Sequence, residues 1–162
     1  EPRYPWPKLR EQYLPWREIP IRIGTAVDAK AAYGHSDLHD VWIVHCPLLT
    51  PEMHAEARRL GAQVWMYSCV IRSWEVLRER YLAGVFSWAN RVRGSFLWAG
   101  RSYAQLWWPQ EGAGPLPMVG YEARRDGVDD YRYLQMLEDC VAANADNRLA
   151  VEAGAWLEAM PL

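Results

Sequence analysis

The sequence is poor in cysteine, in charge of one sign and in long apolar runs. Its 162 residues include three cysteines, Cys46, Cys69 and Cys140, and none of them forms a C-x-x-C pair, so no disulfide framework is expected. The 18 basic and 20 acidic residues give a formal net charge of −2 without a basic block, which argues against nucleic-acid binding. No apolar stretch approaches the length of a membrane span, so no membrane-spanning segment is expected.

Phenylalanine is also scarce, since two Phe stand against ten Trp and nine Tyr. A core needs only large apolar side chains, whereas Trp and Tyr combine a flat apolar face with a polar edge. This combination suits a sugar ring, whose C–H face stacks on an aromatic ring while its hydroxyls form hydrogen bonds. Core packing and carbohydrate binding both stay open as explanations, and composition alone favours core packing.

Short apolar runs alternate with helical patterns along the chain. The runs predicted as strands cover residues 21–26, 41–45, 63–68 and 95–99. The helical patterns cover residues 6–16, 51–60, 73–88, 128–141 and 146–160. This alternation predicts an α/β fold with parallel strands, either a doubly wound sheet or half of a (β/α)8 barrel. No Gly-rich phosphate loop follows a strand, so no nucleotide cofactor is expected.

Individual residues predict several boundaries. Thr50 is expected to cap a helix that Gly61 ends. The helix after the third strand, ended by Gly94, is expected to bury one stripe. That stripe consists of Leu77, Tyr81, Val85 and Trp88.

Four motifs carry a resemblance to a known family. They are the stretch from Tyr121 to Leu134 (YEARRDGVDDYRYL), residues 94–99, residues 64–69 and residues 40–42. In order and spacing they resemble glycoside hydrolase family 123 and its relatives. There, R-x-E-x-x-R-x-G-x-x-D-Y-x-Y-L opens the last barrel helix, and G-F-L-Y-W-A, V-W-x-Y-x-C and D-x-W mark strands. One departure is that Gly120 replaces the first Arg of the long motif.

The resemblance implies a fold. Residues 1–162 would be the C-terminal half of a (β/α)8 TIM barrel, strands five to eight, with an extra C-terminal helix. The N-terminal half of the barrel and any accessory β-sandwich domain would lie outside this chain. Because the chain begins at Glu1 without an initiator Met, we expect its true N-terminus to be missing. The parent protein would then be a candidate for secretion or the periplasm, with its signal in the missing part.

The resemblance also implies a chemistry. Relatives of this family, N-acetyl-β-galactosaminidases among them, cleave N-acetylhexosaminides by a substrate-assisted, retaining mechanism, in which the sugar's 2-acetamido oxygen attacks the anomeric carbon. An Asp-Glu pair follows their fourth strand, and we expect Glu1 to be its second member, with the Asp just before it. Glu1 would then protonate the leaving oxygen and later deprotonate water, without a metal or cofactor. A chance Glu-Pro at this position stays an equal alternative.

Further site residues are expected at the C-terminal ends of the strands, where barrel active sites lie. The candidates for sugar contact are His45, Tyr67, Trp98, Arg101, Tyr103 and Trp107, and Thr25, Cys46, Cys69 and Trp108 lie at similar positions. Tyr67 is assigned a hydrogen bond to the acetamido group or a ring hydroxyl, and Trp98 the floor under the sugar. Because strand residues alternate between faces, packing stays an equal alternative for each of them.

Other clusters are weighed lower. His35 and His39 lie four residues apart, as in zinc sites, but a solvated polar loop with one helical turn is the favoured interpretation. Cys46 and Cys69 are expected to be buried thiols rather than nucleophiles. Asp129 and Asp130 are expected to form ion pairs near the start of a helix.

Two alternatives to a glycosidase stay open. The first is a degenerate barrel that binds glycans or supports neighbouring domains without catalysis. The second is a half-barrel that associates with a second copy of itself.

Overall fold

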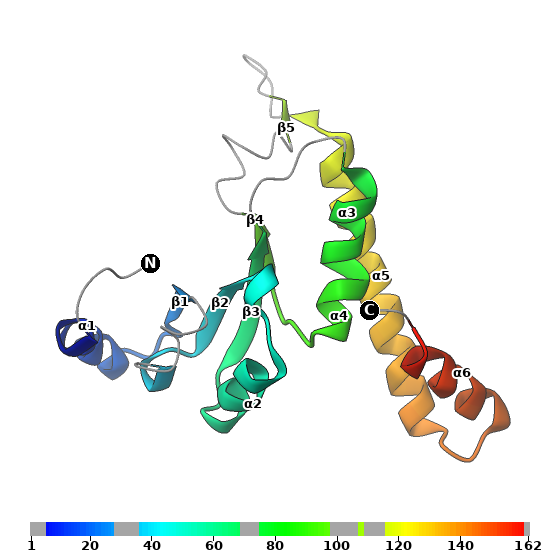
Figure 1. The fold of residues 1–162 in the computed structure, drawn as a ribbon, viewed down its shortest axis with the longest axis horizontal. Coiled ribbons are helices and arrows are strands. Elements are labelled where there is room, and N and C mark those ends of the chain that lie inside the picture. Colours follow the sequence, from blue (N-terminus) through cyan, green and yellow to red (C-terminus); the bar gives the residue numbers. More distant parts are fainter. Residues whose placement is uncertain (1–5, 28–35, 69–74, 98–106, 109–115, 161–162) are drawn as a thin grey trace. The chain divides into compact units, whose positions relative to one another are not determined.

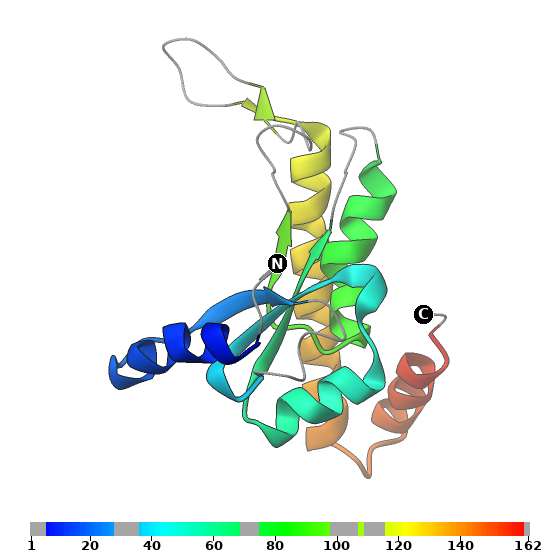
Figure 2. The ribbon, with the colours of Figure 1, turned by 60° about the vertical axis from the view of Figure 1, so that its left-hand side comes forward.

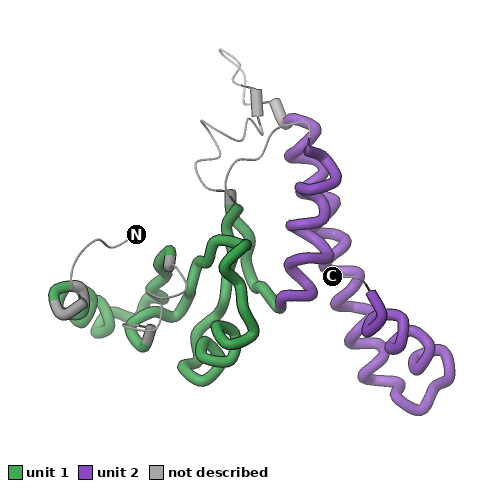
Figure 3. Tube along the Cα trace, in the orientation of Figure 1, with its two compact units in different colours: residues 1–69, 91–98 green, residues 70–90, 99–162 purple. Residues whose placement is uncertain are grey.

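The computed structural model describes residues 6–27, 36–68, 75–97, 107–108 and 116–160. The chain divides into two compact units, which Figure 3 shows in different colours. The sheet unit comprises residues 1–69 and 91–98, and the helical unit comprises residues 70–90 and 99–162.

The sheet unit contains four parallel strands in sequential order (Figure 1). They are β1 (Gly24–Val27), β2 (Val41–His45), β3 (Gln63–Ser68) and β4 (Ser95–Leu97). The α/β fold with a parallel sheet is therefore confirmed. Two of the predicted strands, residues 41–45 and 63–68, have the bounds that the sequence predicts.

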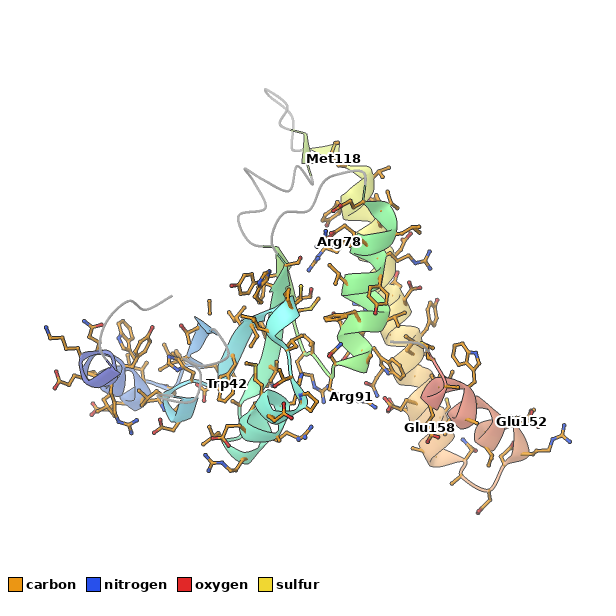
Figure 4. The ribbon with its side chains drawn as sticks, viewed as in Figure 1. Trp42, Arg78, Arg91, Met118, Glu152 and Glu158 are labelled. Carbon is orange, nitrogen blue, oxygen red and sulfur yellow. The ribbon has the colours of Figure 1, made fainter. Side chains whose placement is uncertain are left out.

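The two faces of the sheet differ in burial. Residues that are partners in the register of two neighbouring strands lie on the same face of the sheet. Trp42 is the partner of Val64, and Val44 is the partner of Met66. These four side chains are buried, and Trp42, labelled in Figure 4, has no exposed surface. We call the face that they form the covered face.

The opposite face, here called the second face, is less enclosed. Its side chains along β2, β3 and β4 include Ile43, His45, Trp65, Tyr67 and Phe96. The first four are half-buried, and Phe96 is 41% exposed.

Helix α2 (Pro51–Arg59) packs on the covered face. Thr50 caps it as predicted, because the Thr50 side chain accepts a hydrogen bond from the Met53 N–H, and Pro51 follows at the first helical position. Met53 and Ala57 join the apolar cluster of the covered face. The chain then turns at Gly61, whose φ of 72° is the left-handed conformation that glycine adopts without strain.

Ion pairs and hydrogen bonds hold the N-terminal segment against the residues that precede the strands. It consists of α1 (Trp6–Tyr13) and the 3-10 helix η1 (Leu14–Glu18). Arg10 forms a bidentate pair with Asp37 in the turn η3 (Ser36–Leu38), with N–O distances of 2.9 and 2.8 Å. Asp40 accepts hydrogen bonds from the Ile23 N–H at 2.8 Å and from Arg17 at 2.9 Å, and these lower the pKa of its carboxyl group.

The helical unit is built on two helical stretches that run in the same direction. The first is continuous from α3 (Val76–Tyr81) through the π-helical segment η5 (Leu82–Phe86) to α4 (Ser87–Ala89), and the second is α5 (Val119–Ala143). Both views show them side by side (Figures 1 and 2). Their contacts advance together along both sequences, from Glu79–Arg124 to Trp88–Glu138.

Two glycines allow these helices to approach closely. A Cβ atom at Gly127 would lie 2.4 Å from the Arg80 carbonyl oxygen, and one at Gly84 would lie 2.8 Å from the Gly127 carbonyl oxygen. Beside this crossing, Arg80 donates two hydrogen bonds to Asp130, at 2.6 and 2.8 Å. The helix α6 (Arg148–Glu158) then packs on α5 near Val141, where Gly154 faces it.

Several predicted boundaries are wrong. The first strand begins at Gly24 rather than residue 21, α5 begins nine residues before residue 128, and the last helix begins at Arg148, capped by Asn147. The helix predicted to end at Gly94 ends at Ala89. Its predicted stripe is half right, because Trp88 is buried and Val85 half-buried, whereas Leu77 is 83% exposed and Tyr81 is 39% exposed.

No helix in the described part of the chain is both long and apolar enough to span a membrane.

Candidate functional site

The candidate site lies at the C-terminal edge of the sheet, where β2 and β3 end. His45 and Tyr67 are register partners on these neighbouring strands. Their rings stack with centroids 5.0 Å apart and an angle of 23° between the planes. Both side chains are half-buried on the second face, so each ring has one part packed and another part accessible.

The strand sequences explain why these two rings meet. Side chains alternate between faces, and β2 and β3 both place apolar residues on the covered face: Val44 precedes His45, and Met66 precedes Tyr67. The register that buries Trp42 against Val64 therefore carries His45 beside Tyr67 at the next step. The stacking is a consequence of burying the opposite face.

A second aromatic pair adjoins the first. Trp65 precedes Tyr67 by two residues on the same strand, and its ring centroid lies 5.2 Å from that of Phe96. Phe96 is the register partner of Tyr67. Gly94 makes room for the indole, since a Cβ atom there would lie 2.4 Å from the Trp65 ring. The second face thus carries two aromatic pairs, His45 with Tyr67 and Trp65 with Phe96, on neighbouring strands.

Polar groups at this edge are few. Cys46 follows His45 at the start of the 3-10 helix η4 (Cys46–Leu48), and its side chain is half-buried. The Ser68 hydroxyl at the end of β3 is buried on the covered face, without a hydrogen-bond partner among the described residues. The described residues at this edge, which are the ends of β2, β3 and β4, include no carboxylate.

The structure brings together only some of the predicted site residues. His45 and Tyr67 lie in contact, whereas Trp107 lies in the helical unit, where its backbone pairs with Pro117 between β5 (Trp107–Trp108) and β6 (Leu116–Pro117). Glu1, Trp98, Arg101, Tyr103 and Cys69 lie outside the described residues. Thr25 is not at a strand end as expected: it is the second residue of β1, registered with Trp42.

Two aromatic residues of the site were not singled out from the sequence. Trp65 lies two residues before Tyr67 on β3, so the alternation of faces along that strand could have revealed it. Phe96 lies beside Tyr67 through the register between β3 and β4, which no pattern in the sequence indicates.

Two other clusters have structural roles. His39 is buried, at 4% exposure, with its ring edge-on to Tyr13 at 4.7 Å, so the solvated loop predicted for it is wrong. Asp129 pairs with Arg132 and Asp130 with Arg80, so the expected ion pairs form, but the expected position near the start of a helix is wrong because α5 begins at Val119. Among the described residues no group of three potential metal ligands occurs.

The helical unit contains a buried ion pair that the sequence pattern did not indicate. Glu79 is fully buried, and its Oε2 atom lies 3.3 Å from the Arg124 guanidinium, which is 13% exposed. Burial raises the pKa of Glu79 and lowers the pKa of Arg124, and their mutual attraction opposes both shifts. The Oε1 atom of Glu79 has no partner among the described residues.

Comparison of the chain with models of protein families and with the sequences of curated proteins gives no match.

Proposed function

We propose that the sheet unit is one half of a (β/α)8 barrel whose C-terminal edge binds carbohydrate, in a glycoside hydrolase acting on N-acetylhexosaminides. The observation that carries this proposal is the stacked pair of His45 and Tyr67 at the ends of neighbouring parallel strands. Active sites of barrels are built at this end of the strands.

The strand order favours a barrel over a doubly wound sheet. In doubly wound sheets the order reverses at a switch point, so that helices cover both faces. Here the four strands follow one another without reversal. Right-handed crossovers between strands in this order put every connecting helix on one face. The opposite face then becomes the inside of a barrel, which agrees with α2 on the covered face and with aromatic, half-buried side chains on the second face.

The chemistry of the edge suits a sugar with an acetamido group. Tyr67 offers a hydroxyl beside an apolar ring, and His45 offers a second ring with two nitrogens. An aromatic surface binds the C–H face of a pyranose, while a hydroxyl donor fixes its orientation through one polar atom. We assign Tyr67 to the acetamido group or a ring hydroxyl and the pair with His45 to the wall of the sugar site.

The catalytic part of the proposal rests on Glu1 and on the resemblance. Glu1 would act as the general acid and base of a substrate-assisted reaction, with an Asp before it that orients the acetamido group. Trp98, Arg101, Tyr103 and Trp107 remain proposed sugar contacts, because in the sequence they lie at the end of the fourth predicted strand or in the segment after it. The chain by itself would bind the sugar at one side of a site and not turn it over.

Ligand-observed NMR with this chain tests the binding step. We expect N-acetylgalactosamine or N-acetylglucosamine to bind more tightly than galactose or glucose. Tyr67→Phe should weaken binding about 3- to 10-fold, because one neutral hydrogen bond contributes roughly 0.5–1.5 kcal/mol. The matched control is Tyr133→Phe, since Tyr133 lies on α5 in the helical unit with 69% exposure. Equal affinity of the wild-type protein and Tyr67→Ala would refute the site.

A second candidate is a barrel that binds glycans without cleaving them. It is favoured by one observation, the absence of a carboxylate from the described part of the edge. Hydrolysis of a chromogenic N-acetyl-β-galactosaminide by the parent protein separates the two candidates. Glu1→Gln should abolish turnover while leaving binding intact in the first case, and turnover should be absent from both proteins in the second.

A further inference from the structure

The N-terminal segment of the sheet unit, α1 with η1, is only weakly enclosed. No residue of η1 is buried, and its large apolar side chains Leu14 and Trp16 are 48% and 52% exposed. A segment with so few buried apolar contacts can detach from a folded protein at a low free-energy cost. Its attachment therefore depends strongly on individual side-chain contacts.

Two of these contacts are ion pairs at the surface. Arg10 pairs with Asp37 and Arg17 pairs with Asp40, and the four side chains are between 31% and 48% exposed. Exposed ion pairs contribute little to stability, because water and salt screen them. The two pairs fix where the segment lies, but they do not hold it firmly.

The third contact is buried. The His39 ring lies edge-on to the Tyr13 ring with centroids 4.7 Å apart, and His39 is 4% exposed. A buried imidazole favours its neutral form, because the imidazolium ion would have to give up its hydration. The charged and titratable groups on the elements around this contact are Arg10, Tyr13, Arg17, Arg22, Asp37 and Asp40. Three of them are arginines, and each aspartate already accepts hydrogen bonds from an arginine.

We propose that His39 is a pH-sensitive switch whose protonation releases the N-terminal segment while the sheet stays folded. The inference goes beyond the proposed function and does not depend on it. A histidine side chain in water takes up a proton near pH 6.5, at about its ordinary pKa. His39 is neutral while the segment is attached, and it meets water and is protonated below that pH once the segment is released. The released state then binds the additional proton, so acid favours release.

The two ion pairs do not change over the same pH range. The hydrogen bond from Arg10 is the main cause that lowers the pKa of Asp37, and the hydrogen bond from the Ile23 N–H is the main cause that lowers the pKa of Asp40. Both carboxylates therefore stay ionised between about pH 7.5 and about pH 5.5. Tyrosine and arginine titrate far above this range, so among these groups His39 is the one that responds.

Hydrogen–deuterium exchange followed by mass spectrometry tests the switch at about pH 7.5 and about pH 5.5, with the intrinsic pH dependence of exchange removed. Protection of the α1 amides, residues 6–13, should fall about 10-fold, because one additional proton favours the released state about 10-fold per pH unit below about 6.5. Protection of β3 should stay unchanged, since that strand reports unfolding of the whole sheet unit.

Two variants isolate the imidazole. In His39→Phe a ring remains against Tyr13 but cannot take up a proton, so the protection of α1 should be equal at both pH values. The matched control is His54→Phe, which removes a half-buried imidazole from α2 of the same unit and should behave as the wild-type protein does.

The other outcomes contradict the proposal. If the protection of β3 falls together with that of α1, acid unfolds the sheet unit and there is no local switch. Unchanged protection of α1 in the wild-type protein, or an equal fall in His39→Phe, would also overturn it. If His39→Phe fails to fold by circular dichroism, His39→Gln, which is likewise uncharged in this range, is judged by the same criterion.

Discussion

Replacing Gly127 by alanine should destabilise the helical unit, although alanine is the better helix former. Gly127 lies inside α5, where alanine would by itself contribute about 1 kcal/mol. The new Cβ atom, however, would lie 2.4 Å from the Arg80 carbonyl oxygen and 2.9 Å from the Ala83 Cβ atom. The first neighbour is backbone of a facing helix and cannot rotate away, so the helices must separate.

The expected magnitude follows from these opposing effects. Overpacking of a tight contact costs about 1–3 kcal/mol, and a backbone neighbour puts this site at the upper end. After subtraction of the helix-propensity gain, the free energy of unfolding should fall by about 1–2 kcal/mol. The bidentate pair between Arg80 and Asp130 lies beside the crossing and should weaken at the same time.

Urea unfolding followed by far-UV circular dichroism measures this change. The matched control is Gly154→Ala in α6, where a Cβ atom would meet only the Val141 side chain, at 3.3 Å. That variant should be as stable as the wild-type protein or more stable by up to about 1 kcal/mol. If Gly127→Ala is as stable as Gly154→Ala, the close approach of the helices is not a feature of the folded protein.

Three further predictions concern the ion pairs and the aromatic surface. Because the pKa of Asp40 is lowered in the folded state, the contribution of its carboxylate to the free energy of unfolding is present above the unfolded pKa and is lost as the pH falls below about 4. The loss of stability between about pH 6 and pH 3 should therefore be smaller in Asp40→Asn than in the wild-type protein. An unchanged loss would contradict the assignment. Glu79→Gln should lower the unfolding free energy by about 3 kcal/mol, since it removes the negative charge of Glu79 from beside the buried guanidinium of Arg124. Glu79→Leu combined with Arg124→Leu should recover most of that loss in the same urea titration. Gly94→Ala should displace the Trp65 indole and alter the near-UV circular dichroism spectrum, and an unaltered spectrum would argue against their contact.

The central strands and the α2 cap were predictable from the sequence because local signals determine them. Residues 41–45 are a short apolar run of the kind that fits a buried parallel strand, and Thr50 before Pro51 is a helix start whose hydrogen bond depends only on neighbouring residues. The order of the strands and the sharing of faces were not local and needed the structure.

The errors have a common physical origin in tertiary contacts. Leu77 fits the apolar stripe by spacing, yet Glu79 is the buried residue, because Arg124 on a distant helix compensates its charge. The sequence around His39 predicts a solvated residue, but its ring packs against the ring of Tyr13, which lies 26 positions earlier in the sequence. Of the candidate site, the sequence indicated His45 and Tyr67 individually, but their contact depends on the register between two strands.

The position of Asp40 has a consequence for how this protein can change over evolutionary time. Asp40 ties the N-terminal segment to the starts of the strands, whereas His45 lies at the other end of β2, about 16 Å further along an extended chain. Substitutions separated by more than roughly 10 Å without shared partners act almost independently on stability. Selection can therefore remodel the edge that carries His45 and Tyr67 toward new ligands while the opposite edge keeps the sheet anchored.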